Sequence, residues 1–468
     1  MPPDAPAQPA RSPWLVFSAV AVGNFMSTLD GSIVNVALPT LGRELVVPIA
    51  RLQWMVSAYL LVISATLLTA GRLGDLLGHR RVFVGGLSVF TLGSALCGLS
   101  SSLGALVASR CLQALGATAM MAIGPAILTA VFPPGMRGRA LGAIGSVVAL
   151  GLTAGPPIGG AIVQALSWRW IFFVNLPVGA AGVAWALRVL PRGRAAARAG
   201  LDLPGLALFA AALGLVLLAL DAFPRGGGAL PLAAAGAGAA ALFVVRERRA
   251  AVPVLDAVLL RSRAFSAGLA AGLLSYAAMF SQTFLTPFYL ARVKGLPPGG
   301  LGLMLAAVPV ALSVASPAAG WVNDRVGPRG VSLVGLATLA GGLLALSACG
   351  AEDGLPSVAA RLALCGAGMG LFQAPNNAAV MGAVPRERLG SGGGLLATAR
   401  NVGMAAGVAI SGALFASRAG GAADVPAFLS GWALALRAGA ALAIAAGLVS
   451  LVRSAPAGRG GRGGADGA

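Results

Sequence analysis

Long apolar segments recur along this 468-residue chain, and their length constrains its fold more than any other feature. The hydrocarbon core of a bilayer is about 30 Å thick, and a helix of roughly 20 residues crosses it. Hydrophobic residues make up 57% of the chain and charged residues only 10%, a balance that the surface of a water-soluble protein does not tolerate. The hydropathy pattern predicts fourteen spans, at residues 14–38, 52–70, 82–100, 103–131, 139–163, 170–190, 203–221, 229–245, 265–290, 299–321, 331–349, 356–384, 391–415 and 428–452.

The predicted spans are helices, because lipid offers backbone N–H and C=O groups no hydrogen-bond partners. A closed β-barrel also satisfies these groups, but its strands need only about 9–11 residues of alternating polarity. The segments in this chain are longer and uniformly apolar. We therefore expect an all-α polytopic membrane protein.

Basic residues indicate the orientation, because loops rich in Lys and Arg stay on the cytoplasmic side during insertion. With the N-terminus inside, 22 of the 33 basic residues fall in the N-terminal arm, the inner loops and the tail, and 7 fall in outer loops. Both termini are therefore predicted to be cytoplasmic. The net charge of +19 does not indicate a nucleic-acid partner, since the basic residues are dispersed over short loops that face anionic membrane lipids.

Rare residue types argue against most enzyme classes. The single lysine, Lys294, is followed by Gly295, so no Gly-Lys-Ser/Thr phosphate-binding loop exists. His79 is the only histidine, which excludes zinc sites built on a histidine pair, and the four cysteines show no metal-type spacing. We expect no enzyme activity, no metal and no cofactor, with an ion gradient as the energy source.

One loop sequence occurs twice and indicates two related halves. Both copies fall in inner loops, so the halves are predicted to be parallel repeats of six helices with two helices inserted between them. The predicted boundaries are 1–190 for the first half, 191–260 for a linker with the inserted pair, 261–454 for the second half and 455–468 for a disordered tail. The repeated residues, each pair 249 positions apart, are Gly71, Asp75, Gly78, Arg80 and Val82 in the first copy and Gly320, Asp324, Gly327, Arg329 and Val331 in the second.

The first copy resembles the loop signature of the major facilitator superfamily, and over nearly its whole length the chain resembles the fourteen-helix drug:proton antiporters of that superfamily, the multidrug efflux type. Asp75 can accept hydrogen bonds from a neighbouring helix N-terminus or pair with an arginine, in contacts that break when the halves rock. Ordinary turn chemistry is the alternative, and His79 stands where the family usually has a basic residue. The resemblance implies a conformational latch made of Gly71, Asp75, Gly78, Arg80, Arg81, Asp324 and Arg329.

Asp30 is the only carboxylate placed deep inside a strongly apolar span, and an acid in such a position indicates function. It is followed by Asn35, Ala37, Leu38 and Pro39, a pattern similar to the first helix of the fourteen-helix family. The predicted span 103–131 resembles the superfamily's buried-arginine motif through Arg110, Gln113, Gly116 and Ala117.

Asp30 and Arg110 have similar predicted depths, roughly 10 to 12 Å below the outer surface, so their side chains can meet. Loss of water favours a neutral carboxyl group, whereas a nearby guanidinium favours the ionised form. Our hypothesis is that Asp30 binds a proton and the substrate alternately, with Arg110 as its partner in proton coupling. The alternative is a static buried ion pair that only fixes helix packing.

The predicted span 139–163 resembles the signature associated with antiporters in this superfamily. Small residues four positions apart allow close helix approach, and two prolines remove backbone donors and bend the span. The counterpart in the second half keeps Gly403, Gly407 and Gly412 but has no proline. Generic tight packing is the alternative for these residues, which are Gly151, Gly155, Pro156, Pro157, Gly159 and Gly160.

Family analogy makes the first, fourth, ninth and twelfth spans central to a substrate cavity. Aromatic faces and amides in these spans can hold flat, lipophilic or cationic compounds, although packing or lipid contact is an alternative for each aromatic residue. In the segment 168–177, which also matches the family, Trp168 and Trp170 are expected as anchors at the outer interface. The expected cavity residues are Asn24, Gln113, Tyr276, Phe280, Gln282, Phe284, Phe288, Phe372, Gln373, Asn376 and Asn377.

These features favour a proton-coupled antiporter that exports drugs or other lipophilic or cationic small molecules across the cytoplasmic membrane of a bacterium. We expect it to work as a monomer, by rocking of its two halves around a midplane site. A dedicated exporter of one metabolite or of a self-made antibiotic is the first alternative. A non-transporting membrane sensor or a membrane-embedded enzyme is a remote one.

Overall fold

The structure is a computed structural model that describes residues 12–191, 202–223, 228–250, 255–385, 388–419 and 424–452. All regular secondary structure in these ranges is helical. The predicted linker at 191–200 lies outside them except for its first residue, and so does the predicted tail at 455–468. The helices are α1 (Pro13–Glu44), α2 (Ile49–Leu77), α3 (His79–Leu99), α4 (Leu103–Val131), α5 (Pro134–Ala165), α6 (Trp170–Phe173), α7 (Asn175–Val189), α8 (Leu203–Ala222), α9 (Ala229–Arg249), α10 (Ala257–Leu260), α11 (Arg263–Arg292), α12 (Pro298–Leu305), α13 (Ala307–Val326), α14 (Pro328–Ser347), α15 (Leu355–Gly382), α16 (Leu389–Ala419) and α17 (Val425–Leu451).

The predicted class, an all-α polytopic membrane protein, is confirmed. Thirteen helical stretches in the described residues are long and apolar enough to cross a membrane. The 32-residue helix α1 supplies the fourteenth span, and it is less apolar because it carries Asn24, Asp30 and Asn35. Several helices are longer than predicted, since the apolar pattern marks only the part within the hydrocarbon core. Helix α5, for example, runs from Pro134 to Ala165 where residues 139–163 were predicted.

Two predicted spans are each interrupted once. The span 170–190 consists of α6 and α7, which meet at Val174, and the span 299–321 consists of α12 and α13, which meet at Ala306. Both junction residues keep right-handed helical backbone angles, so the chain continues in nearly the same direction. The first interruption lies directly before Asn175, a residue of the candidate site.

The sequence repeat is also a repeat in packing. In the first half, a Cβ on Gly116 of α4 would collide with the backbone of α3 at Gly86 and Phe90. In the second half, a Cβ on Gly368 of α15 would collide in the same way with α14 at Gly335 and Leu339. Both pairs of helices therefore approach closely at glycine, as small residues at helix interfaces in membranes permit.

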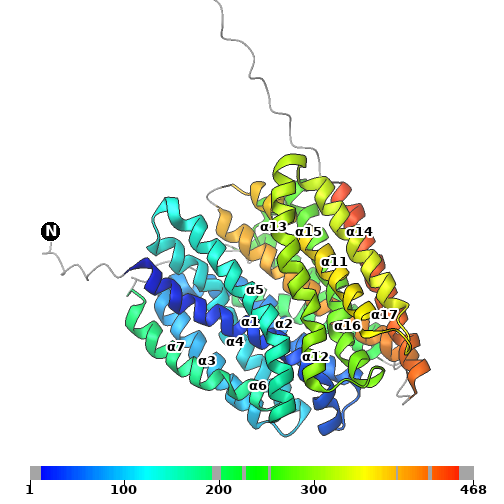
Figure 1. Ribbon diagram of the computed structural model, residues 1–468. Helices are drawn as coiled ribbons and strands as arrows, with labels where there is room; N and C mark the ends of the chain where they lie inside the picture. The colour runs from blue at the N-terminus through cyan, green and yellow to red at the C-terminus, as the bar shows by residue number, and fades with distance from the viewer. Residues whose placement is uncertain are drawn as a thin grey trace, which may run out of the picture.

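The end of the bundle at which α1 begins, predicted to be cytoplasmic, is called the inner end, and the opposite one the outer end. At the outer end the halves are in contact, because Gly160 of α5 packs against Pro298, and Gly302 of α12 against Pro156. Gln164 of α5 also accepts a hydrogen bond of 2.8 Å from the backbone N–H at the start of α12. In Figure 1, α5 and α12 meet near the lower edge, while the inner ends of α5 and α13 stand apart near the upper edge.

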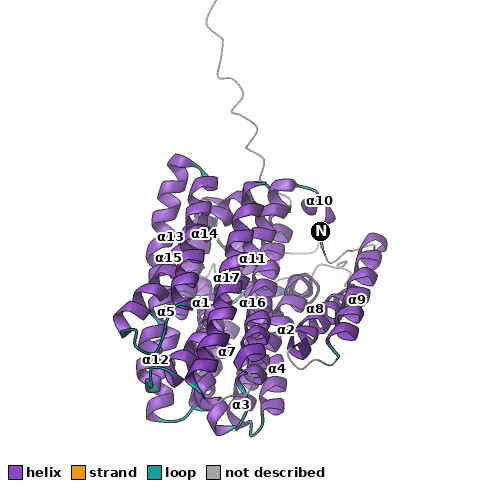
Figure 2. Ribbon diagram, turned by 90° about the vertical axis from the view of Figure 1, so that its right-hand side faces the viewer, coloured by secondary structure: helices purple, strands orange, loops and turns teal. Residues whose placement is uncertain are grey.

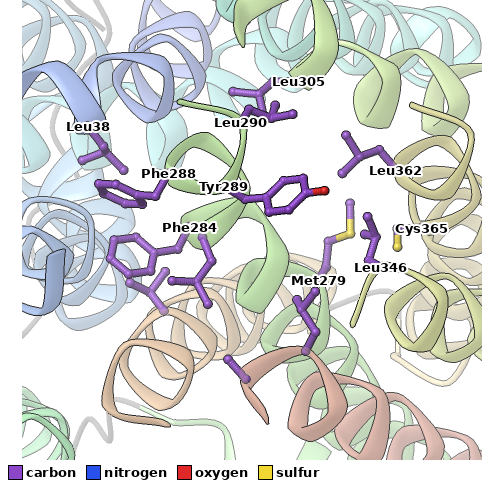
Figure 3. Close-up of a cluster of buried hydrophobic side chains, with 14 of the residues drawn as sticks. Leu38, Met279, Phe284, Phe288, Tyr289, Leu290, Leu305, Leu346, Leu362 and Cys365 are labelled. Carbon is purple, nitrogen blue, oxygen red and sulfur yellow. The ribbon is translucent and has the colours of Figure 1, made fainter. Parts of the chain in front are cut away.

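A buried apolar cluster completes the outer contact. Leu38 of α1 is fully buried and lies beside Phe284 and Phe288 of α11 (Figure 3). The two phenylalanine rings pack edge to face, with centroids 5.6 Å apart. Contacts between the halves toward the inner end run mainly along α2 and α16, where Gly394 faces Leu68. The contacts of α5 with α12 and of α1 with α11 close the outer end between the halves.

The inserted helices α8 and α9 form a hairpin at the side of the bundle, next to α2 (Figure 2). Helix α8 packs against α2 of the first half and α16 of the second, so it lies over the seam between them. Asp221, the last residue of the predicted span 203–221, lies near the end of α8 and accepts a hydrogen bond of 2.8 Å from Gln53 of α2. Helix α9 is largely exposed, so it lies at the periphery.

Candidate functional site

A fully buried carboxylate lies in the core of the first half. The side chain of Asp30, on α1, has no solvent exposure, and that of Arg110, on α4, is 2% exposed. Arg110 Nη1 donates a charge-assisted hydrogen bond to Asp30 Oδ2. The contact predicted from their depths is therefore present, while the role of the pair in proton coupling stays a prediction.

Three further side chains complete a hydrogen-bonded cluster around Asp30. Gln113 Nε2, on α4, donates to Asp30 Oδ1 at 2.8 Å and to Ser94 Oγ, on α3, at 2.6 Å. Asn175 Nδ2, on α7, donates to the same two oxygens at 3.2 Å each. Four helices of the first half thus meet at one carboxylate.

The guanidinium group of Arg110 is held from both sides. Its Nη1 also donates to Gln113 Oε1 at 2.5 Å, and its carbon atom Cζ lies 4.0 Å from the ring centroid of Tyr59, on α2. The Nε atom of Arg110 is buried and has no hydrogen-bond partner. A proton that arrived at Asp30 would leave the Arg110 charge without its counter-ion in a site of low polarity. Protonation must therefore be accompanied by a rearrangement around Arg110, which is what a conformational switch requires.

The glycines of the predicted antiporter motif pack α5 against α1. A Cβ on Gly151, Gly155 or Gly159 would press on Thr28, Ser32 or Ile33 of α1 respectively. Ser32 Oγ donates a hydrogen bond of 3.1 Å to the Gly151 carbonyl. The next turn, Pro156 with Gly160, faces α12 across the outer contact, and Pro157 is half-buried. In the second half, Gly403 and Gly407 pack α16 against α11 in the corresponding manner, without prolines.

A cavity of about 130 Å³ lies between α11, α15 and α16 in the inner part of the second half. Five of the eleven expected cavity residues line it, namely Tyr276, Phe372, Gln373, Asn376 and Asn377. A second cavity, of about 510 Å³, lies at the outer end between α1, α2, α11 and α16, with Phe288 in its wall.

The other expected cavity residues have different surroundings. Gln113 belongs to the Asp30 cluster, and Asn24 is buried and bonds to the carbonyl of Val20 in its own helix. Gln282 is buried and bonds to Thr283 and Thr286. Phe284 and Phe280 belong to, or pack on, the apolar core. These residues do not line the cavity between α11, α15 and α16, and their part in substrate binding stays a prediction. Residue type and span number do not fix which face of a helix a side chain occupies.

The predicted latch residues make contacts within their own halves. Asp75 Oδ1 lies 3.3 Å from Nε2 of His79, one helical turn further on. The expected partner was an arginine. Arg80 donates to the carbonyl of Leu187 near the end of α7, and Arg329 donates to that of Leu451 at the end of α17, at 3.3 Å. Each arginine thus caps the last helix of its half, where a cation is favourable.

The remaining latch residues shape the two loops. Gly78 and Gly327 have φ values of 92° and 85°, which suit glycine. Gly71 has open space at its Cβ position, and Arg81 is exposed. Asp324 lies in the last turn of α13, and its side chain is outside the described part of the chain.

Sequence reasoning missed three members of the site. Asn175 was visible in the segment 168–177, but this segment was interpreted as an interfacial anchor. Ser94 and Tyr59 carried no signal of their own. Of the two expected anchors, Trp170 is 49% exposed, whereas Trp168 is buried and donates to Glu44 at 2.8 Å, so it holds α1 within the protein.

Comparison with known proteins identifies the fold and the family. A sequence profile described as the Major Facilitator Superfamily matches residues 20–298 and 268–467, which together cover most of the chain. The chain belongs to the major facilitator superfamily. The superfamily predicted from the loop signature is therefore confirmed.

Two relatives in the superfamily illustrate the range of substrates. The chain is 35% identical to the riboflavin transporter RibZ of Clostridioides difficile, over 87% of this chain and 89% of that one. It is also 35% identical to the multidrug resistance protein Stp of Mycobacterium tuberculosis, over 87% of this chain and 76% of that one. Relatives of this kind support the drug-efflux type within the superfamily and a transporter rather than an enzyme.

A solved structure agrees with the fold. A bacterial homolog of the human lysosomal transporter Spinster, in an inward-facing and occupied conformation, matches with a TM-score of 0.70. The match covers 96% of this chain and all of that one, at 15% sequence identity. At this identity the likeness concerns the fold alone.

Proposed function

We propose that this member of the major facilitator superfamily is a proton-coupled antiporter that exports small organic molecules by alternating access. The observation that carries the proposal is the fully buried carboxylate of Asp30, to which Arg110, Gln113 and Asn175 donate hydrogen bonds. A buried acid whose protonation accompanies a conformational change can couple substrate transport to a proton gradient. The cytoplasmic termini follow the distribution of basic residues, and the export direction follows the resemblance to the drug:proton antiporters.

The proposed cycle has two states that differ in the surroundings of Asp30. In the state described here, which is closed at the outer end, the carboxylate of Asp30 accepts a hydrogen bond from Arg110. Rocking of the halves would open the outer end, admit a proton to Asp30 and release Arg110 for another partner. Release of the proton from Asp30 to the inner side would complete the exchange.

The proton gradient supplies enough free energy for such a cycle. One elementary charge moved through 100 mV is worth about 2.3 kcal/mol, and a tenfold concentration ratio costs about 1.4 kcal/mol. One proton can therefore sustain export of a neutral compound against a ratio of tens. The substrate range stays open between many drugs and one compound, since the relatives include a protein named for multidrug resistance and one named for riboflavin.

Efflux from proteoliposomes under an imposed pH gradient tests the proposal, with fluorescein, riboflavin and rhodamine 123 as anionic, neutral and cationic dyes. Asp30→Asn should abolish the response of efflux to the pH gradient and retain dye exchange without a gradient. Asp424→Asn, which changes an exposed aspartate before α17, is the matched control and should behave like the wild type.

Two outcomes would contradict the proposal. Gradient-driven efflux that Asp30→Asn leaves undiminished would show that another group carries the proton. Because Asp30→Asn leaves Arg110 unpaired, the double variant Asp30→Asn/Arg110→Gln is tested beside it, since it removes both charges and keeps polar groups in place. If the double variant folds and its efflux still responds to the pH gradient, the Asp30–Arg110 pair has a packing role only.

A further inference from the structure

Arg400 is an arginine inside a membrane span that faces a cavity. It lies on α16, eleven residues after the first residue of that helix, and it lines the cavity between α11, α15 and α16. The hydroxyl of Tyr276, on α11, lies within hydrogen-bonding reach of its guanidinium group. A charged group at this depth is costly and needs a partner.

No carboxylate in the described part of the chain pairs with Arg400. Among the other arginines within spans, Arg110 pairs with Asp30 and Arg361 pairs with Asp353 at 2.9 Å. Arg437 is exposed on the surface of α17. Arg400 is half-buried, and the residues that line its cavity include no aspartate or glutamate.

The neighbours of Arg400 suit a flat aromatic molecule that carries an anionic group. Gln373 and Asn377, on α15, bring amide groups to the cavity, and Phe372 and Tyr276 bring aromatic rings. Guanidinium groups and amide N–H groups bind carboxylates and phenolates, and aromatic rings stack on planar molecules. A cavity of about 130 Å³ is smaller than a complete drug site of about 300–1,000 Å³, so it forms one part of a larger site.

The outer cavity has the same electrostatic character. Its walls include Arg43, on α1, and Arg292, on α11, and no acidic residue. A substrate that passes from the inner cavity to the outer end would therefore meet cationic side chains at both places. This pattern favours an anion over a cation along the path.

We infer that Arg400 is the anion-binding residue of a substrate subsite, and that the exported compound is an aromatic organic anion, such as a carboxylate or a phenolate. This inference rests on the proposed export function and replaces the lipophilic or cationic compounds expected from the sequence. It also gives the transport cycle a net charge. Export of a monovalent anion against entry of one proton moves two charges in the direction that an inside-negative potential drives.

Binding to the purified protein tests the inference without any gradient. Fluorescein and rhodamine 123 share a xanthene ring system and carry opposite charges. Arg400→Gln should weaken fluorescein binding about tenfold or more, because it removes a charged hydrogen-bond donor, and should leave rhodamine 123 binding unchanged or tighter. Arg400→Lys keeps the charge and should retain part of the fluorescein affinity. Arg437→Gln, which removes an exposed intramembrane arginine, is the control and should match the wild type.

The outcomes separate this inference from the proposed antiport. Fluorescein affinity that does not change in Arg400→Gln, or equal losses for both dyes, would overturn the anion subsite. The same result in a protein whose efflux still depends on Asp30 would leave the antiport standing. Conversely, a charge-selective loss in Arg400→Gln supports the subsite even if Asp30→Asn leaves gradient-driven efflux intact. If Arg400→Gln does not fold, a folded Arg400→Lys variant decides the question. A partial loss of fluorescein affinity with unchanged rhodamine 123 binding supports the subsite, and equal losses for both dyes overturn it.

Discussion

Gln113 on α4 and Asn175 on α7 donate hydrogen bonds to the same oxygen, Asp30 Oδ1, at 2.8 Å and 3.2 Å. The second oxygen, Oδ2, accepts from Arg110. These donors come from two helices, α4 and α7. Movement of α4 or α7 relative to α1 therefore breaks hydrogen bonds to the Asp30 carboxylate.

Asn175→Ala should weaken coupling without removing the ion pair. The substitution deletes one donor to Asp30 and one to Ser94, so efflux driven by a pH gradient is expected to fall about tenfold. Asn35→Ala is the control, since the Asn35 amide only approaches the Gly31 carbonyl of its own helix at 3.4 Å. Equal rates for the two variants in proteoliposomes would remove Asn175 from the site.

The two charges of the buried pair should not be equally replaceable. Asp30→Asn leaves a guanidinium that cannot lose its proton, and a broken buried pair costs about 3–5 kcal/mol. Arg110→Gln leaves a carboxyl group that can neutralise itself by taking up a proton. We expect Asp30→Asn to lower the thermal unfolding temperature more than Arg110→Gln does.

The double variant Asp30→Asn/Arg110→Gln should be more stable than Asp30→Asn alone, because no unpaired charge remains. Unfolding temperatures of all four proteins in the same detergent give the coupling between the two positions. If the decreases in unfolding temperature of the two single variants sum to the decrease of the double variant, the two side chains do not interact as the structure describes.

Much of the architecture could be predicted from the sequence, because the bilayer imposes one helix length on every span. Depth counting placed Asp30 near Arg110, and the two side chains are in contact. The division into two halves, predicted from the repeat at Gly71 and Gly320, stays a prediction. The number of helices and the depth of a residue in the membrane depend only on position along the sequence, which the hydropathy pattern reports directly.

Rotation of helices about their axes could not be predicted in the same way. Asn24 and Gln282 lie on expected helices but face their own backbone or neighbouring side chains instead of a cavity. Asn175 and Ser94 come from helices that family analogy did not treat as central. Arg400 was recognised only as a basic residue within a span, because its relation to the cavity depends on α11 and α15 as well as α16.

Gly155→Ala should destabilise the contact between α5 and α1. The new Cβ would overlap Ser32 Oγ, and overpacking of this kind costs about 1–3 kcal/mol. Gly145→Ala on the same helix meets nothing within 4 Å and serves as the control. Thermal unfolding should be lower for Gly155→Ala only, and Ser32→Gly in the same chain should restore part of the loss. Equal behaviour of the two alanine variants would contradict the close approach.

Asp202 should anchor the inserted hairpin at all but acidic pH. Hydrogen bonds from Arg246, at 3.0 and 3.1 Å, hold the pKa of Asp202 below its ordinary value of 3.8, and the backbone N–H of Gly205 adds to this. Since the folded-state pKa is depressed, the stabilisation is complete above pH 3.8 and is lost as the pH falls through the lower value. Asp202→Asn should therefore increase proteolysis of the hairpin at pH 7, and its difference from the wild type should shrink as the pH falls below 3.8. A difference that does not shrink with falling pH would contradict the assignment, and Asp424→Asn should show no difference at any pH.

The outer contact between Gly302 and Pro156 should set which end of the transporter is open. Gly302→Ala would push its new Cβ into the Pro156 carbonyl of α5, a backbone group that cannot move aside as a flexible side chain does. The substitution penalises only the state in which α12 touches α5, so it should shift the population toward an opening at the outer end. Gly300→Ala, whose Cβ would make only ordinary contacts on the same helix, should leave the population unchanged.

The shift can be measured with Leu38→Cys in a chain whose four native cysteines are replaced by alanine. Leu38 is fully buried between the halves, so a membrane-impermeant maleimide can reach a thiol at this position from outside only when the outer end opens. Gly302→Ala should increase the labelling rate about tenfold, the change expected if overpacking costs the closed state about 1.4 kcal/mol. Labelling that is already fast without Gly302→Ala, or that rises equally with Gly300→Ala, would show that the α5–α12 contact does not control the outer opening.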